Sequence, residues 1–326
     1  MNGDAWRKQT TFTTAPLRSL IAIGAGAGVG LSVVGVIALS GPPNTPGPRL
    51  ATAAQSVTAP AEGAYWHRRT LSRTIHPRQL GRGANRYWVE ERQLVEDWVS
   101  PDGKAWFGYR PLGTRPKSPA DEKAWRRDGS PTTWNRTAEG TVVSLSTKAD
   151  KGRVDPVKGR PSTFLLAGQW LSYEELQRLP AEPAGLKAWL GQAARVAKVP
   201  DDDIDDQVTR TLPSLLHEVP VSKEIRTAAY RALSTMPGVR SLGKVKDERG
   251  RIGDGLSIVS EQTNREKVTS VDRTQMIIDT GEMVLLSRAI RLTGKINGKP
   301  LPETNTTVTM LQVGWTDDEP SVPALP

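Results

Sequence analysis

The residues that could carry acid–base, nucleophilic or metal chemistry are few and scattered in this sequence. It has three histidines, His67, His76 and His217, and no cysteine. A metal site needs such ligands to converge, and the spacing of these three does not predict convergence. We interpret His217, near a predicted helix end, as a capping or surface residue. No G-x-S-x-G or S-x-x-K motif pairs a nucleophile with a base. The sequence therefore predicts no enzyme, no metal site and no cofactor.

The acidic run Asp201–Asp206 is the other candidate for cation chemistry. A calcium loop requires glycine at its sixth position and glutamate at its twelfth, and this chain has Asp206 and Leu212 there. The run follows Pro200 at a predicted helix start, where carboxylates interact favourably with the helix dipole. We interpret it as helix-start charge.

Aromatic residues are the remaining candidates for a binding site, because ten tryptophans accompany only three phenylalanines. An apolar cleft for an acyl chain or a peptide is one interpretation. The other is that the rings form the core of a domain without disulfides. The candidate ligand-binding residues are Trp66, Trp88, Trp98, Trp106, Phe107 and Trp170, with Tyr65 and Phe164 nearby.

The glycine-rich stretch Arg18–Pro43 predicts a membrane anchor. Its glycines alternate without the third glycine of a dinucleotide loop, and it contains no lysine for a P-loop. About 20 largely apolar residues suffice to cross a bilayer as a helix. The apolar run is too long for a typical cleaved signal peptide, so an uncleaved anchor is favoured. The predicted span includes Leu20, Gly24, Gly28, Leu31 and Leu39.

Basic residues Arg7, Lys8 and Arg18 precede the span, so the positive-inside rule places the N-terminus in the cytoplasm and the larger part outside. We expect a single-pass protein of the cell membrane. The predicted organisation is a cytoplasmic tail (1–18), a transmembrane helix (19–40), a Pro/Ala/Thr-rich spacer (41–64), an extracytoplasmic domain (65–316) and a disordered tail (317–326).

Strands, then helices, then strands are predicted within the outer domain. Residues 64–76 resemble a first strand, and Ser100–Gly103 is a type I turn that predicts a hairpin carrying Trp98 and Trp106. Residues 111–139 lack periodicity and predict a loop or short strands. Ser172 and Glu175 form a capping box, and the 183–199 and 222–236 segments have apolar helical faces. Hairpins follow. The fold class is α+β, with an antiparallel sheet packed on three to four helices.

A net charge of +9 favours anionic partners, and the predicted location outside the membrane excludes nucleic acid as the expected one. Phospholipid headgroups and anionic wall polymers remain. A chain that is basic because of its overall arginine content is the alternative explanation.

Three segments carry a family resemblance: WVSPDGKAWFGYR (98–110), residues 215–259 with ALSTMPGVR and KDERGR, and MIIDTGEMVLLSRAI (276–290). They resemble the blocks of an actinobacterial family of uncharacterised single-pass membrane proteins, whose genes often neighbour extracytoplasmic-function sigma factors. The resemblance implies an exported domain and a component of a sigma/anti-sigma system. Residues 251–255 depart from the family pattern. A looser likeness, to the half-barrel of lipoprotein carriers and sigma-factor regulators, implies a curved sheet with an apolar face.

Two functions remain open from the sequence. The first is a membrane-tethered extracytoplasmic binding or sensor module for a lipid or acylated ligand, linked to envelope signalling. The second is a structural or interaction protein that binds anionic wall polymer or a partner domain through its basic surface, without an internal ligand.

Overall fold

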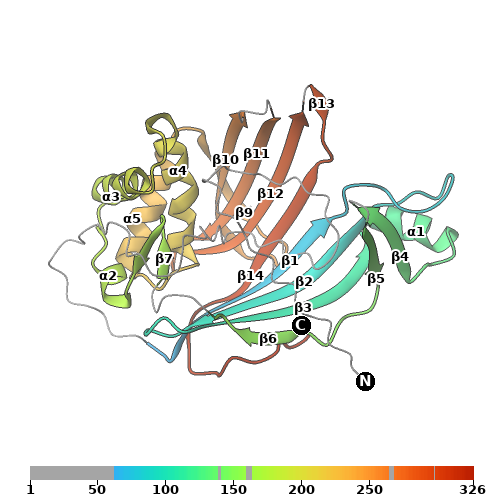
Figure 1. Cartoon of the computed structure of the whole chain (residues 1–326), viewed down its shortest axis with the longest axis horizontal. Helices are drawn as coiled ribbons and strands as arrows, with labels where there is room; N and C mark the ends of the chain where they lie inside the picture. Colours follow the sequence, from blue (N-terminus) through green and yellow to red (C-terminus); the bar gives the residue numbers. More distant parts are fainter. Residues whose placement is uncertain (1–61, 139–140, 159–163, 264–267, 297) are drawn as a thin grey trace, which may run out of the picture.

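A large antiparallel sheet organises the chain in the computed structural model, which describes residues 62–138, 141–158, 164–263, 268–296 and 298–326. Within these residues the ten-stranded sheet has the order β6-β3-β2-β1-β14-β12-β11-β10-β9, and β13 pairs with β12. Figure 1 shows it strongly twisted, with β10–β12 running at a steep angle to β1–β3. Its strands are β1 (Tyr65–Ile75), β2 (Val89–Val99), β3 (Ala105–Pro116), β6 (Arg153–Pro156), β9 (Val239–Lys246), β10 (Ile252–Thr263), β11 (Val268–Asp279), β12 (Val284–Ile296), β13 (Lys299–Pro300) and β14 (Thr304–Thr316). The predicted α+β class is confirmed.

The β2–β3 hairpin forms where the sequence predicts it. The N–H of Gly103 donates to the carbonyl of Ser100 at 2.8 Å, and Gly103 has φ of 80°, which glycine adopts without strain. The turn places Trp98 opposite Trp106, as expected from their positions on either side of it.

Alternation along the strands divides the side chains between two sides of the sheet. Arg68, Asp97 and Arg288 lie on what we call the helix-facing side, and His67, Glu96 and Trp98 lie on the other. The β9–β10 hairpin carries a bulge at Gly255/Leu256. Its turn reaches back across the sheet: Glu248 pairs with Arg73 of β1, and Arg251 donates to the carbonyl of Leu286 in β12.

Helices pack on one side of the sheet and supply most of the core. They are α2 (Tyr173–Gln177), α3 (Pro183–Val196), α4 (Ile204–Thr211) and α5 (Lys223–Ser234), with short 3-10 turns η1 (Asp201–Asp203) and η2 (Leu212–Leu216). They gather at one end of the molecule (Figure 1). The core joins Leu190, Leu216 and Leu233 from this layer to Met276 and Met310 from the sheet. A short hairpin of β7 (Phe164–Leu166) and β8 (Gln169–Leu171) adds Phe164 to the same core.

The helix α1 (Pro119–Arg127) lies within the segment that the sequence analysis expected to be a loop or short strands. Ser118 caps it, Pro119 occupies the first turn, and Asp121 precedes a basic last turn, so the start and stop signals were present. The pattern of apolar residues is weak because only Ala124 of this helix is buried. It packs near Tyr87 and Val89, beside β4 (Thr133–Ala138) and β5 (Thr141–Ser146).

Residues 317–326 follow β14 as an extended segment that we call the strap. We expected a disordered tail, but Pro323 is buried and Arg69 donates to the carbonyl of Ala324 at 2.6 Å. The predicted membrane span (19–40), with Leu20, Gly24, Gly28, Leu31 and Leu39, lies outside the described residues. Among the described residues no helix has the length and hydropathy that a membrane span requires.

Candidate functional site

The candidate aromatic residues are divided between the two sides of the sheet. Trp66 is buried on the helix-facing side, where its ring makes an edge contact with Trp315, and Trp315 in turn contacts Tyr173. Trp98 is buried on the opposite side, and its ring stacks on that of His67 with the ring centroids 4.8 Å apart. Neighbouring positions of a strand pair point in opposite directions, so these two rings do not line one cleft.

The other candidates extend this division. Trp106 pairs with Trp98 and contacts Tyr65 at 5.4 Å, whereas Phe107 points to the helix-facing side and stacks on Tyr109. Trp88 precedes β2, and its backbone N–H donates to the carboxylate of Asp121 in α1. Trp170 is half-buried in β8. The structure brings Trp98 and Trp106 together but not all six candidates.

Charged side chains meet instead at the junction between the helices and the sheet. We call Arg68, Asp97, His217, Glu218 and Arg288 the charge cluster. Arg68 donates to Asp97 at 2.6 Å and lies 3.7 Å from Glu218. His217 lies 3.4 Å from Glu218 through Nε2, and its Nδ1 donates to the carbonyl of Pro213 at 2.9 Å. The cluster thus joins β1, β2 and β12 to the residues that follow η2.

Opposing effects set the pKa of each group in the cluster. Burial would raise the pKa of Glu218, but the hydrogen bond from His217 and the charges of His217, Arg68 and Arg288 lower it to about 2. Burial lowers the pKa of His217, and Glu218 opposes this shift only in part. Burial would also lower the pKa of Arg68, but Asp97 and Glu218 raise it overall. At neutral pH the cluster therefore holds an ionised Glu218.

Arg288 is the least satisfied member of the cluster. Burial lowers its pKa despite the nearby charge of Glu218. Its buried Nε has no hydrogen-bond partner among the described residues. Glu218 is already in contact with Arg68 and His217. A guanidinium with an unused donor on the helix-facing side can bind a carboxylate or phosphate oxygen.

Of the two roles predicted for His217, capping is confirmed, because it is the C-cap of η2 and its ring bonds the carbonyl of Pro213, whereas a surface position is wrong, because only 2% of its surface is exposed. Its position near a helix end was read correctly, but η2 turns the ring inward against the sheet. The charge cluster was missed because its members come from four distant segments. The signal that could have indicated it was the uncommon pair His217-Glu218 inside the apolar run from Leu212 to Val221.

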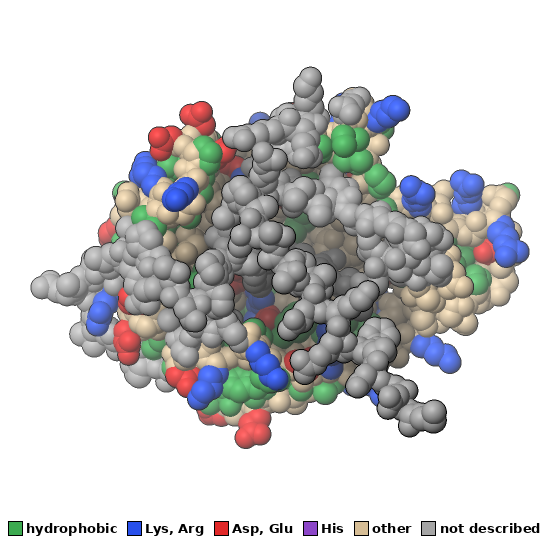
Figure 2. Space-filling model, viewed as in Figure 1, with side chains coloured by type: hydrophobic (Ala, Val, Ile, Leu, Met, Phe, Trp, Pro, Cys, Tyr) green, Lys and Arg blue, Asp and Glu red, His purple; other side chains and the backbone are tan. Residues whose placement is uncertain are grey.

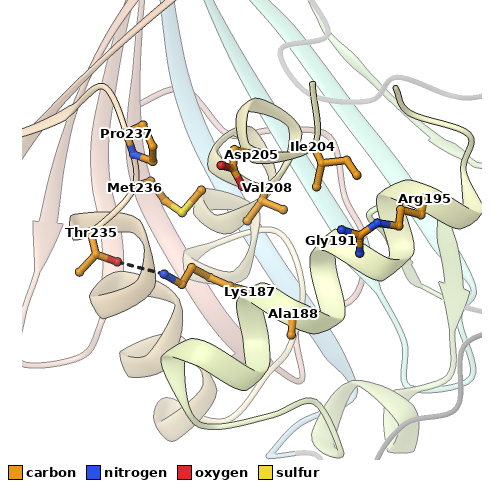
Figure 3. A pocket seen from close by; sticks show the side chains of 10 residues that line it. All are labelled: Lys187, Ala188, Gly191, Arg195, Ile204, Asp205, Val208, Thr235, Met236 and Pro237. Carbon is orange, nitrogen blue, oxygen red and sulfur yellow. Dashed lines mark hydrogen bonds between the residues drawn. The ribbon is translucent and has the colours of Figure 1, made fainter. Parts of the chain in front are cut away.

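A surface groove of about 290 Å³ lies between α3, α4 and the end of α5. Figure 3 shows Ile204, Val208 and Met236 at its floor, with Lys187 and Arg195 at its sides. The two cations are occupied: Lys187 contacts the hydroxyl of Thr235, and Arg195 lies 3.8 Å from Asp201. None of the aromatic residues predicted to bind a ligand lines it, but Asp205 of the acidic run does.

Surface charge is uneven around the molecule. Figure 2 shows Lys and Arg side chains projecting at the end that carries α1, and Asp and Glu among them at the helical end. The predicted helix-start charge at Asp201–Asp203 lies there and is exposed. No group of three or more histidines, aspartates and glutamates with the geometry of a metal site occurs in the described part of the chain.

Comparison with known proteins adds little to this geometry. No family model matches the chain, and no curated protein matches it. A solved β-barrel-like protein of a domain of unknown function, DUF1849, from Brucella abortus is 10% identical. Its match covers 78% of this chain and 99% of the other, with a TM-score of 0.19. A structure of lipid–protein interactions in lipovitellin is 9% identical, over 81% of this chain and 26% of the other, with a TM-score of 0.24. These TM-scores are too low to carry an argument. The resemblance to the actinobacterial family stays a prediction.

Proposed function

We propose that the chain is a membrane-tethered extracytoplasmic binding module whose ligand is an amphiphile with an anionic headgroup. The observation that carries the proposal is Arg288, a partly buried cation with an unused donor on the helix-facing side. Nε itself is buried, so an anionic headgroup would approach the exposed remainder of this half-buried side chain, and Arg68 lies close enough for its charge to act on Arg288. The membrane tether rests on the predicted span at 19–40.

Two apolar side chains follow Arg288 along the same strand. Ile290 and Leu292 follow at intervals of two residues, so they share the helix-facing side, and both are half-buried. Acyl or other apolar groups of the ligand would contact these side chains while the headgroup meets Arg288. The likeness to a half-barrel carrier rests on the sequence resemblance alone. The link to envelope signalling and to a sigma/anti-sigma system rests on the family resemblance alone.

Binding without catalysis is the chemistry we propose for this site. His217 supplies the imidazole of the cluster, but its Nδ1 is hydrogen-bonded to a backbone carbonyl and its Nε2 faces Glu218. A general base needs a free nitrogen directed at a substrate. We therefore assign the cluster the role of positioning a headgroup and not of transferring a proton.

The test is the lipid content of the full chain purified from bacterial membranes in mild detergent. We expect native mass spectrometry to show a retained anionic lipid on the wild type and its loss in Arg288→Gln. Arg291→Gln is the matched control, because Arg291 lies on the same strand, is exposed and pairs with Glu303. Retention of the same mass in all three proteins, or its absence from the wild type, contradicts the proposal.

A second candidate function has its own observation at the α1 end. Exposed Lys123, Arg126 and Arg127 of α1 lie on one helix, and Arg127 donates to Asn85 in the loop that carries Arg82 and Arg86. Such a cationic surface suits an anionic wall polymer. We expect Lys123→Gln with Arg127→Gln to weaken cosedimentation with cell-wall polymer if this surface is the site. Arg288→Gln leaves that binding unchanged, so the two functions are distinguishable.

A further inference from the structure

A second candidate binding surface lies on the side of the sheet away from the helices. Its centre is Gly108 of β3, which pairs with Glu96 and lies between the rings of Trp98 and Pro323. A Cβ added at Gly108 would lie 3.0 Å from the ring of Trp98 and 3.1 Å from Cγ of Pro323. Because Gly108 has no side chain, Pro323 of the strap packs against it beside Trp98, in a space that we call the slot.

Aromatic side chains form the walls around this slot. Trp98 is stacked on His67, and Trp106 is next to it across the hairpin with Tyr65 at its edge. Proline rings pack well on flat aromatic faces, and aromatic-lined surfaces are a recurring means of recognising proline-rich segments.

A polar network fixes the strap beside the aromatic wall. Arg69 donates to the carbonyl of Ala324 at 2.6 Å, and its Nε lies 3.2 Å from Glu96. Glu96 in turn contacts His67 at 2.9 Å, and His67 carries the stack with Trp98. Glu96 and His67 are both buried. The slot at Gly108 and Arg69, which binds a backbone carbonyl of the strap, therefore belong to one network of contacts.

The strap itself has the pattern of a proline-rich ligand. Pro320, Pro323 and Pro326 recur every third residue. A polyproline II helix has three residues per turn, so such a repeat places its prolines along one edge. Pro323 is buried, whereas its neighbours Val322 and Ala324 are exposed. The strap is therefore held by one proline ring, by the hydrogen bond from Arg69 and by a hydrogen bond from the N–H of Ala64 to Asp317.

We propose that the Trp98–Gly108–Arg69 surface is a proline-recognition site, that the strap occupies it within the chain, and that a proline-rich segment of a partner protein occupies it when the strap is displaced. A tethered ligand has an effective concentration in the millimolar range, so it excludes a weak partner until the strap lifts. Because Arg288 lies on the other side of the sheet, this site is independent of the amphiphile site proposed above.

The experiment uses the full chain and a fluorescent decapeptide with the sequence of residues 317–326. We expect Pro323→Asp to open the site, because a carboxylate cannot occupy the apolar slot. The peptide should then bind this variant at least about tenfold more tightly than the wild type, since the tethered competitor has left. Val322→Asp is the matched control: it places the same charge at an exposed position of the strap and should behave as the wild type.

Two further variants locate the binding. A peptide with alanine in place of its central proline should bind the opened chain at least about tenfold more weakly, as expected for loss of a ring from an aromatic slot. Adding Arg69→Gln to the opened chain should weaken binding of the original peptide in the same way. Pro323→Gly opens the site without a buried charge and replaces Pro323→Asp if the latter does not fold. Equal binding to the wild type and the opened chain, or no binding to either, overturns the proposal.

Discussion

At the scale of single residues, Glu218 shows how neighbouring charges keep a half-buried carboxylate ionised. Arg68, His217 and Arg288 surround one carboxylate, and their combined effect outweighs the cost of removing it from water. This balance keeps Arg288 positively charged, while not every N–H donor of its guanidinium has a hydrogen-bond acceptor. A charge cluster of this kind is expensive to bury, which is a reason to look for a ligand there.

The lowered pKa of Glu218 predicts an acid-sensitive stability. The group has a pKa of about 2 in the folded chain against an ordinary value of 4.5, so its stabilisation is complete above about pH 4.5 and is lost as the pH falls towards 2. The full effect is on the order of 3 kcal/mol. The lowered pKa of His217 acts in the same direction, because the unfolded chain gains a proton first as the pH falls below 6.5.

We therefore expect Glu218→Gln to unfold at a lower urea concentration at about pH 7, because Arg68 and Arg288 lose their charged partner. Below about pH 4.5, the stability of this variant should fall less steeply with pH than that of the wild type. The measurement is the urea midpoint as a function of pH, followed by fluorescence. Exposed Glu182→Gln should keep the slope of the wild type. A wild-type slope in Glu218→Gln would show that this carboxyl is not the group responsible.

At the scale of elements, local signals in the chain place the helices that hold the cluster. The capping box predicted at Ser172 and Glu175 is confirmed: Ser172 accepts from the N–H of Glu175, and Glu175 accepts from the N–H of Ser172. The predicted stripe of α5, from Ile225 to Leu233, is buried. These elements form a platform on which η2 presents His217 and Glu218 to the sheet.

Removal of the cap gives a test at this scale. Ser172→Ala leaves the N–H of Glu175 without its partner and should lower the free energy of unfolding by about 1 kcal/mol. Urea unfolding monitored by circular dichroism measures it. The control is Ser234→Ala at the C-terminal end of a different helix, α5. It removes only a hydrogen bond to the carbonyl of Tyr230 at an exposed position, and it should change the free energy of unfolding by less than about 0.5 kcal/mol. Equal effects of the two would contradict the assignment.

At the scale of the whole molecule, one core connects the helical layer to both halves of the sheet. It includes Leu216 from η2, Met276 from β11 and Val99 and Ala105 from the β2–β3 hairpin. The strap and the β9–β10 turn cover the opposite side. The charge cluster therefore lies between elements that cannot separate without exposing the core.

Truncation of the core should report this cooperativity. Leu216 is fully buried, so Leu216→Ala removes core contacts and should lower the free energy of unfolding by about 2–5 kcal/mol. We also expect one transition when tryptophan fluorescence and far-UV circular dichroism are compared. Leu242→Ala, at an exposed position on the edge strand β9, should stay within about 0.5 kcal/mol of the wild type. Two separated transitions would show that the sheet and the helices unfold independently.

The sequence by itself determined the features that depend on near neighbours in the chain. The Ser100–Gly103 turn, the cap at Ser172 and the apolar faces of α3 and α5 each involve residues within about one turn or one hairpin, so their patterns are visible in one dimension. The α+β order of elements follows from them. The apolar stretch at 19–40 predicts an anchor for the same reason, although it lies outside the described residues.

Only the tertiary structure decided which side chains meet. Arg68, Glu218 and Arg288 belong to three segments separated by many residues, and their convergence depends on the order of β1, β14 and β12 in the sheet. Strand alternation set Trp66 and Trp98 on opposite sides, a consequence of register that the list of tryptophans did not reveal. The return of the strap to Gly108 is likewise a long-range contact. Composition shows that such groups exist, but pairing across the sheet determines which of them can form a site.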